Sequence, residues 1–157
     1  MVKPLKKKYK KKIVITGGNG LLGNYFYKKY KNVYKIIKYP HRIEKFKVFE
    51  KWLSKKRFNY FIHFAAITKN ESKQFKKILQ LVNVKSPIRI LNIINKKKDN
   101  YFSYFLFISS SHVYGYSKKK IKETSRRIPK NIYGKSKKRV EDYILKNRKK
   151  FNFKIGI

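Results

Sequence analysis

Three polar side chains in the second half of the chain have the types and spacing that proton transfer requires. Tyr133 and Lys137 form a Y-x-x-x-K pair, and residues four apart lie on the same face of a helix. An ammonium group beside a phenol lowers the phenol pKa toward the range of a general acid or base. Ser110 follows an apolar run, so its hydroxyl could hold a substrate oxygen beside that phenol at a strand end. In a lysine-rich chain the pair alone also arises by chance, so its place after other motifs matters more.

Gly17, Gly20 and Gly23 have the spacing G-x-x-G-x-x-G, directly after the apolar run Ile13–Ile15 and before a segment that opens at Leu21. This order predicts a strand, a tight turn and the start of a helix, which is the context of a dinucleotide-binding turn. Gly17 allows the turn, Gly20 a close approach to a pyrophosphate, and Gly23 close packing of the helix on the strand. The helix N-terminus offers N–H groups and a positive dipole end to the phosphates. The alternative is a glycine turn that is only structural.

The rest of the chain alternates between predicted strands and helices. We expect strands at 11–16, 33–39, 58–64 and 101–109 and the start of another within 151–157, with helices at 21–30, 44–56, most of 71–98 (bent near Pro87) and 131–150. This alternation predicts a Rossmann-type, doubly wound parallel α/β sheet covered on both faces. We expect one domain over 11–157 after a flexible basic leader at 1–10, a first helix packed through Leu21, Leu22, Tyr25 and Phe26, and a second helix with core residues Phe46, Phe49, Trp52 and Leu53.

The composition excludes several classes of protein. The 157 residues contain no cysteine, which rules out disulfides and thiolate metal sites, and no apolar run is long enough to span a bilayer. The formal net charge is +37, with 44 Lys and Arg against 7 Asp and Glu. Lysines are spread over every segment and accompany other residues with A- and T-rich codons, so base composition explains much of this charge. We expect a cytoplasmic protein without a membrane partner or a metal, with nonspecific adhesion to polyanions.

The end of the second predicted strand bears on the choice of cofactor. In dinucleotide folds an acidic residue there binds the ribose 2′-hydroxyl, whereas an arginine suits a 2′-phosphate. Here the sequence runs Lys38-Tyr39-Pro40-His41-Arg42, without a carboxylate. The cofactor is therefore predicted to be NAD(P), with a preference for NADP.

Taken together, these motifs resemble the extended short-chain dehydrogenase/reductases, the NAD-dependent epimerase/dehydratase family. The resemblance covers 11–157 and rests on these segments: Thr16-Gly17-x-x-Gly20-x-x-Gly23, His63-x-Ala65-Ala66, Asn83, Ser109-Ser110-x-x-Val113-Tyr114-Gly115, Glu123 and Tyr133-x-x-x-Lys137. It implies a catalytic set of Ser110, Tyr133, Lys137 and Asn83, and cofactor-binding residues Gly17, Gly20, Leu21, Leu22, Gly23, Arg42, Ala65, Ala66, Tyr133 and Lys137. His63 is expected to be a buried strand-end residue and not a catalyst.

The resemblance also implies a nucleotide-sugar substrate, and it has departures. Dehydratases of the family place Asp-Glu after the catalytic Thr, whereas this chain has Ser111 and His112, which disfavours a dehydratase. The C-terminal half that supplies most of the substrate pocket in the family is not present, so we expect a fragment, a truncated gene product or a missing lobe from another polypeptide. A homodimer is also possible.

His112 is a further candidate for acid–base chemistry. It lies two residues beyond Ser110, and an imidazole with an unperturbed pKa of about 6.5 can exchange protons near neutral pH. The alternative is a loop residue that only packs or forms hydrogen bonds.

Three functions remain open from the sequence. The first is the cofactor-binding and catalytic half of an NAD(P)-dependent nucleotide-sugar epimerase or reductase. The second is a noncatalytic dinucleotide-binding or interaction module that has lost its substrate lobe. The third is a polyanion-binding protein that uses the fold only as a scaffold.

Overall fold

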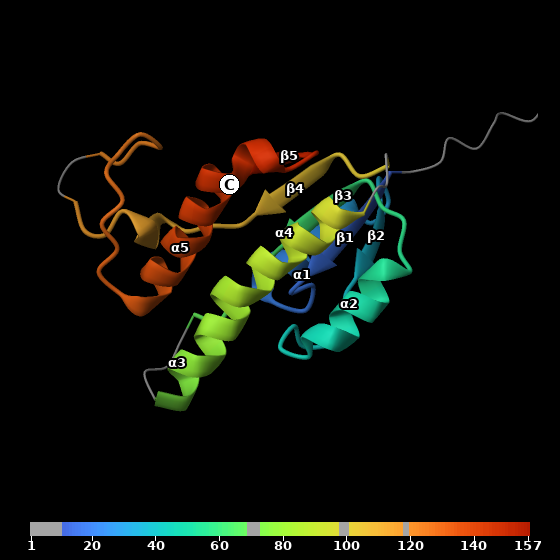
Figure 1. Cartoon of the computed structure of the whole chain (residues 1–157), viewed down its shortest axis with the longest axis horizontal. Helices are drawn as coiled ribbons and strands as arrows, with labels where there is room; N and C mark the ends of the chain where they lie inside the picture. The colour runs from blue at the N-terminus through green and yellow to red at the C-terminus, as the bar shows by residue number, and fades with distance from the viewer. Residues whose placement is uncertain (1–10, 69–72, 98–100, 118–119) are drawn as a thin grey trace, which may run out of the picture.

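The computed structural model describes residues 11–68, 73–97, 101–117 and 120–157, so the predicted leader at 1–10 lies outside the described residues. Five strands form one sheet (Figure 1): β1 (Lys12–Thr16), β2 (Lys35–Lys38), β3 (Tyr60–His63), β4 (Tyr104–Phe107) and β5 (Lys154–Gly156). Their order is β2-β1-β3-β4-β5, and every neighbouring pair is parallel. The predicted doubly wound parallel sheet is confirmed. Its direction of winding reverses between β1 and β3, where sheets of this kind bind ligands.

The helices connect these strands in the predicted alternation. They are α1 (Leu21–Tyr30), α2 (Phe46–Ser54), α3 (Lys73–Leu79), α4 (Ser86–Lys96) and α5 (Ile132–Asn147), with short 3₁₀ turns η2 (Ser111–Val113) and η3 (Arg148–Lys150). Between α3 and α4 the chain forms a π-helical segment, η1 (Gln80–Lys85). The departure from α geometry therefore falls one turn before Pro87, where the sequence predicted a bend.

The core forms where apolar strand residues meet the helices. Val14 and Ile15 of β1 are fully buried, as expected for a central strand of a parallel sheet. Phe61 of β3 stacks on Phe105 of β4 with ring centroids 5.4 Å apart. On α2, Phe49 and Leu53 are buried and Phe46 and Trp52 pack against the same cluster, which confirms the predicted face of that helix.

The predicted packing face of α1 is confirmed for Phe26 and wrong for Leu21, Leu22 and Tyr25. The side chains of Leu21, Leu22 and Tyr25 are 88%, 59% and 63% exposed, respectively. Gly23 is the buried residue of the helix, and Phe26 packs on the cluster of Ile13 and Ile15. Because Gly23 must face the turn that precedes the helix, residues three and four positions further along face the sheet, and the leucines point away from it.

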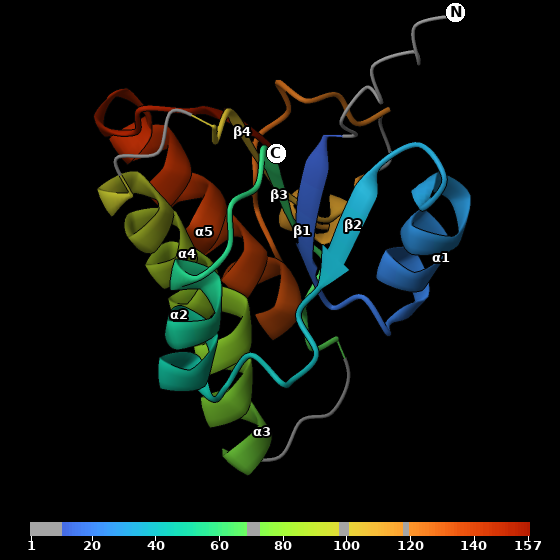
Figure 2. The ribbon, with the colours of Figure 1, turned by 90° about the vertical axis from the view of Figure 1, so that its right-hand side faces the viewer.

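The two faces of the sheet are covered unequally. Figure 2 shows α2, α4 and α5 on one face and α1 on the other. On the α1 side a groove of about 490 Å³ stays open; its lining is Ile13, Phe26, Tyr34, Tyr60, Ile62, Ser103, Tyr104, Leu106 and Lys154. The prediction of a sheet covered on both faces is therefore wrong on the α1 side over β3, β4 and β5.

In the described ranges no helix has the length and apolarity to cross a bilayer.

Candidate active site

Three loops that carry candidate functional residues meet at one edge of the sheet. The parallel register pairs Thr16 with His63 and His63 with Phe107, so β1, β3 and β4 end side by side. The glycine turn after β1, the loop at 64–67 after β3 and the segment 108–110 after β4 therefore share this edge. This is the edge at which parallel α/β sheets place their ligands.

The glycine turn has the geometry that its spacing predicts. Gly17 has a φ of +69°, and a Cβ there would lie 2.6 Å from the backbone nitrogen of Ala65, so only glycine fits. A Cβ on Gly23 would collide with the carbonyl oxygen of Gly17, which shows that Gly23 packs on the turn and not, as predicted, on the strand. A Cβ on Gly20 would meet only that same oxygen, at 3.4 Å. The space beside Gly20 is thus free for a ligand.

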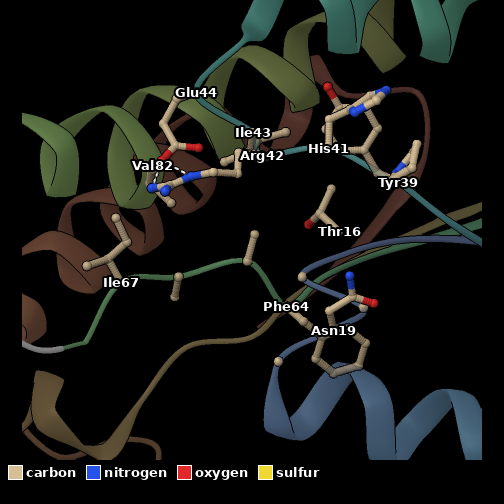
Figure 3. A pocket seen from close by; sticks show the side chains of 16 residues that line it. Thr16, Asn19, Tyr39, His41, Arg42, Ile43, Glu44, Phe64, Ile67 and Val82 are labelled. Atoms are coloured by element: carbon tan, nitrogen blue, oxygen red, sulfur yellow. Dashed lines mark hydrogen bonds and ion pairs between the residues drawn. The ribbon is translucent and has the colours of Figure 1, made fainter.

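A pocket of about 350 Å³ opens directly above this turn (Figure 3). Its lining comes from three loops: Thr16, Gly17, Gly18, Asn19 and Gly20; Tyr39, Pro40, His41, Arg42, Ile43 and Glu44; and Phe64, Ala65, Ala66 and Ile67, with Val82. The predicted residues Arg42, Ala65 and Ala66 are among them. Leu21 and Leu22 do not line the pocket. Only their backbone N–H groups, at the N-terminus of α1, could serve the predicted binding of the cofactor.

Arg42 is held by a carboxylate that the sequence analysis missed. Its Nη2 and Nε lie 2.5 and 3.0 Å from Oε1 of Glu44, and both residues line the pocket (Figure 3). Burial works to raise the pKa of Glu44, but the hydrogen bond and charge of Arg42 outweigh it and hold that pKa below its usual range. The loop therefore presents an ion pair. The signal for it was an acidic residue two positions after an arginine.

Ser110 and Tyr133 are brought together as predicted. The Ser110 hydroxyl lies near the phenol of Tyr133, which is half-buried. Burial raises the phenol pKa of Tyr133, and the Ser110 hydroxyl only partly offsets this. The prediction that the neighbouring lysine lowers this pKa is wrong for the chain alone, because desolvation dominates.

Lys137 lies on the same helix face but points toward the end of β4. Its Nζ donates a hydrogen bond of 2.7 Å to the carbonyl of Ile108 and lies 5.7 Å from the centre of the Tyr133 ring. The side chain is only 2% exposed. Burial lowers the pKa of Lys137 to about 8, even though Glu141 works to raise it. Tyr133 and Lys137 have the predicted spacing, but the Lys137 ammonium donates its hydrogen bond to the Ile108 carbonyl and not to the phenol.

Asn83 connects the pocket to this helix. Its amide oxygen accepts from the backbone N–H of Ile67 at 2.8 Å, and its amide nitrogen donates to the Ile67 carbonyl at 2.9 Å and to Oγ of Ser136 at 3.2 Å. Ser136 in turn donates to the carbonyl of Tyr133 at 2.6 Å. Asn83 is 1% exposed. It thus fixes the position of the tyrosine through Ser136, a residue that the sequence analysis did not select although it precedes Lys137 directly.

His112 is exposed and held beside the tyrosine. The amide of Asn131 donates to its Nδ1 at 2.8 Å, and its ring meets the ring of Tyr133 edge-on at 5.8 Å. A second pocket of about 160 Å³ adjoins it, with this lining: Ser111, His112, Gly115, Tyr116, Ile121, Lys130 and Asn131. The structure therefore places His112 within reach of whatever approaches Tyr133 from the solvent side.

His63 is fully buried at the end of β3, as predicted. A hydrogen bond of 2.8 Å joins its Nδ1 to the hydroxyl of Thr16, and its Nε2 has no partner among the described residues. Burial, together with the charge of Lys137, lowers the pKa of His63 to about 3, so the imidazole is neutral at physiological pH.

Across the described ranges, no cluster of three or more His, Asp or Glu side chains could hold a metal ion.

Comparison with known proteins agrees with this geometry. The profile of the NAD dependent epimerase/dehydratase family matches residues 13–157. No curated protein matches the chain. Among solved structures, the chain resembles Helicobacter pylori ADP-L-glycero-D-manno-heptose-6-epimerase with a TM-score of 0.74 at 21% identity, over 88% of this chain and 51% of that one.

Two further structures give the same result. The UDP-glucuronic acid 4-epimerase of Bacillus cereus, in complex with NAD, has a TM-score of 0.75 at 20% identity, over 92% of this chain and 53% of that one. The UDP-Glc/GlcNAc 4-epimerase of Campylobacter jejuni has a TM-score of 0.78 at 21% identity, over 92% and 52%. The chain thus spans about half the length of these structures. With a profile match over nearly all of its residues, the chain belongs to the NAD-dependent epimerase/dehydratase family.

Proposed function

We propose that the chain is the cofactor-binding half of an NAD(P)-dependent nucleotide-sugar epimerase or reductase, and that it carries the Ser110, Tyr133 and Lys137 chemistry. The observation that carries this proposal is the meeting of two groups at one sheet edge. The glycine turn and its pocket follow β1, and Ser110, which follows β4, lies near the phenol of Tyr133 on α5. Asn83 bonds to both sides of this edge, through Ile67 and Ser136.

The residues around the pocket fit a dinucleotide. The open side of Gly20 leaves room for a pyrophosphate against the backbone, where the N-terminus of α1 favours negative charge. Ala65 and Ala66 keep the opposite wall low enough for close approach. When bound, the nicotinamide would supply the group that accepts and returns a hydride.

Proton transfer falls to the chain's own residues. Ser110 would hold the substrate oxygen, and Tyr133 would take the proton from a sugar hydroxyl and later return it. A raised phenol pKa makes Tyr133 a poor base in the chain alone. Bringing the Lys137 ammonium closer to the phenol, away from the Ile108 carbonyl, would lower that pKa. Lys137 would also bind the nicotinamide ribose, and Asn83 would support the relay through the position of Tyr133.

The proposed substrate is a nucleotide sugar, because the epimerases that share the fold are named after UDP-sugars. Since those chains are about twice as long, we propose that the rest of the sugar pocket comes from a C-terminal lobe or a partner chain. The proposed location is the cytoplasm. A homodimer stays a proposal with no interface assigned.

We further propose a preference for NADP over NAD. Arg42 lines the pocket on the loop after β2, at the place where an arginine suits a 2′-phosphate. Glu44 already neutralises part of this charge, so a 2′-phosphate must compete with it for the guanidinium. The preference is therefore expected to be small.

A second candidate is a noncatalytic dinucleotide-binding module. One observation favours it: the Lys137 ammonium donates to the Ile108 carbonyl and lies 5.7 Å from the centre of the Tyr133 ring, while the phenol pKa is raised. Product analysis separates the two candidates in a protein that also carries the rest of the sugar pocket. The first either converts a nucleotide sugar to its epimer, with the cofactor returned unchanged, or reduces a keto-sugar nucleotide at the expense of NAD(P)H, whereas the second does neither.

Cofactor binding itself is tested by thermal unfolding with and without NAD and NADP. A ligand at 100 times its Kd stabilises a protein by about 2.7 kcal/mol, which is several degrees in Tm for a domain of this size. Gly20→Val should abolish this gain and leave the fold intact, because its Cβ meets only one atom. Leu21→Ala is the matched control, since that side chain is exposed and outside the pocket. Equal gains in wild type and Gly20→Val would remove the basis for the site.

A further inference from the structure

Glu141 is buried on the same face of α5 as the proposed catalytic pair. It is 5% exposed, and it stands four residues after Lys137 and eight after Tyr133. The chain has only 7 acidic residues in all, yet two of them, Glu141 and Asp142, are adjacent here. A buried carboxylate is costly unless it is paired, so its partners indicate what it does.

The partners of Glu141 come from two different segments. The hydroxyl of Ser109, at the end of β4, donates to Oε1. Arg127, on the loop before α5, donates from Nη1 to Oε2 at 2.7 Å and pairs through Nη2 with Asp142 at 2.8 Å. Asp142 in turn pairs with Lys138 at 2.7 Å. Glu141 thus joins the strand end, the loop and the helix.

Three successive residues after β4 are tied to this one helix face. Ile108 accepts from Lys137, Ser109 donates to Glu141, and the Ser110 hydroxyl lies near the phenol of Tyr133. The middle tie is the one that the proposed mechanism does not use. We propose that Glu141 is a positioning residue, which holds the Ser109–Ser110 strand end on α5 and places its carboxylate on the Lys137 face of that helix. This inference rests on the proposed function for its meaning in catalysis, but not for its geometry.

The electrostatic environment of Lys137 supports this role. Tyr133 and Glu141 face it from its own helix, and His63 faces it from β3. The residues of β4 and its end offer only the Phe107 ring and the Ile108 carbonyl, and Arg127 acts on it through Glu141. Glu141 is the one anion among these groups, and His63, neutral at physiological pH, adds no charge. It opposes the burial that lowers the pKa of Lys137 to about 8.

The test measures the charge of Lys137 in the whole chain by ¹³C NMR of labelled lysine side chains. The resonance of Lys137 is assigned by its loss in Lys137→Arg. It should titrate near pH 8, well below the value of about 10.4 for a free lysine side chain. Glu141→Gln should lower this midpoint by about one unit, the lower end of the effect of a close opposite charge. Asp142→Asn is the matched control, because it removes the same charge from the neighbouring position and also breaks one Arg127 pair; in it the midpoint of Lys137 should shift far less than in Glu141→Gln.

Two outcomes overturn the inference: an unchanged midpoint in Glu141→Gln, or an equal shift in Asp142→Asn. If Glu141→Gln does not fold, Arg127→Met gives a test of opposite sign. It removes the cation that competes for Glu141, so the midpoint should rise, and a fall or no change counts against the role. The NMR result does not depend on a cofactor. If wild type binds neither NAD nor NADP in the thermal assay, the proposed function fails while this inference can still stand.

Discussion

Tyr133 and Lys137 show how far residue spacing determines chemistry. Their separation on α5 places them on one helix face, as the motif predicts. Their pKa values depend on how the fold buries them: burial raises that of Tyr133 and lowers that of Lys137 to about 8. The spacing therefore selects the residues, and the surroundings decide their charge.

The Arg42–Glu44 pair predicts how the cofactor preference responds to substitution. Glu44→Gln frees the guanidinium of Arg42. NADP should therefore bind to this variant about tenfold more tightly than to wild type, as expected for one charge-assisted hydrogen bond. Arg42→Ala should weaken NADP by a similar factor and leave NAD nearly unchanged. Calorimetric titrations of both dinucleotides measure these ratios. Tighter binding of NAD than of NADP to wild type would contradict the proposed preference.

His112 is the second prediction at this scale, and it requires a complete enzyme. Residues 11–157 are joined to the second half of a solved epimerase, and turnover is measured against pH. If His112 is the substrate acid or base, His112→Ala should slow epimerisation by about 10²- to 10⁴-fold and spare hydride transfer. Tyr133→Phe is the control that should stop both. An unchanged rate and pH profile in His112→Ala would make it a residue that only packs on Tyr133.

At the scale of elements, polar side chains fix the strand ends relative to one another. Asn83, in the π-helical segment η1, bonds to the loop after β3 and to α5. Thr16 and His63 join β1 to β3 directly below the pocket. π-Helical turns are often found at functional sites, and here the turn carries the residue that links pocket and helix.

The burial of His63 beside Lys137 predicts a loss of stability in acid. The pKa of His63 is about 3 in the folded chain against 6.5 in a free side chain, so below pH 6.5 the unfolded state binds a proton that the folded state does not. The free energy of unfolding should therefore fall as pH drops from 6.5 toward 3, by up to about 5 kcal/mol from this group. His63→Gln removes this titration, so urea unfolding should show a shallower loss over that range. Identical pH slopes in the two proteins would exclude His63 as the cause.

At the scale of the whole molecule, the net charge of +37 predicts adhesion to polyanions. Wild type should bind two DNA duplexes of unrelated sequence with equal affinity in 50 mM salt. If it makes six to ten phosphate contacts, affinity should fall by about 10³- to 10⁵-fold by 200 mM. Binding measured by fluorescence anisotropy across salt concentrations tests this. An affinity that prefers one sequence and survives 200 mM salt would favour a dedicated nucleic-acid function instead.

The local sequence determined the elements and most of the candidate residues. The run Ile13–Ile15 could only be a buried strand, because three consecutive apolar β-branched residues suit a strand covered on both faces. The glycines determined the turn, since Gly17 needs a positive φ. Ser110, Tyr133 and Asn83 were predicted from motifs and lie together in the structure.

Only the tertiary structure decided which partners these residues have. Leu21 and Leu22 have the apolar character of a packing face, yet the contact of Gly23 with the turn rotates them into solvent. Ser136 and Glu141 were not predicted as site residues, because the hydrogen bonds and ion pairs that involve them depend on distance in space more than on distance along the chain. Burial, which sets the pKa of Lys137 and His63, is likewise a property of the packed fold.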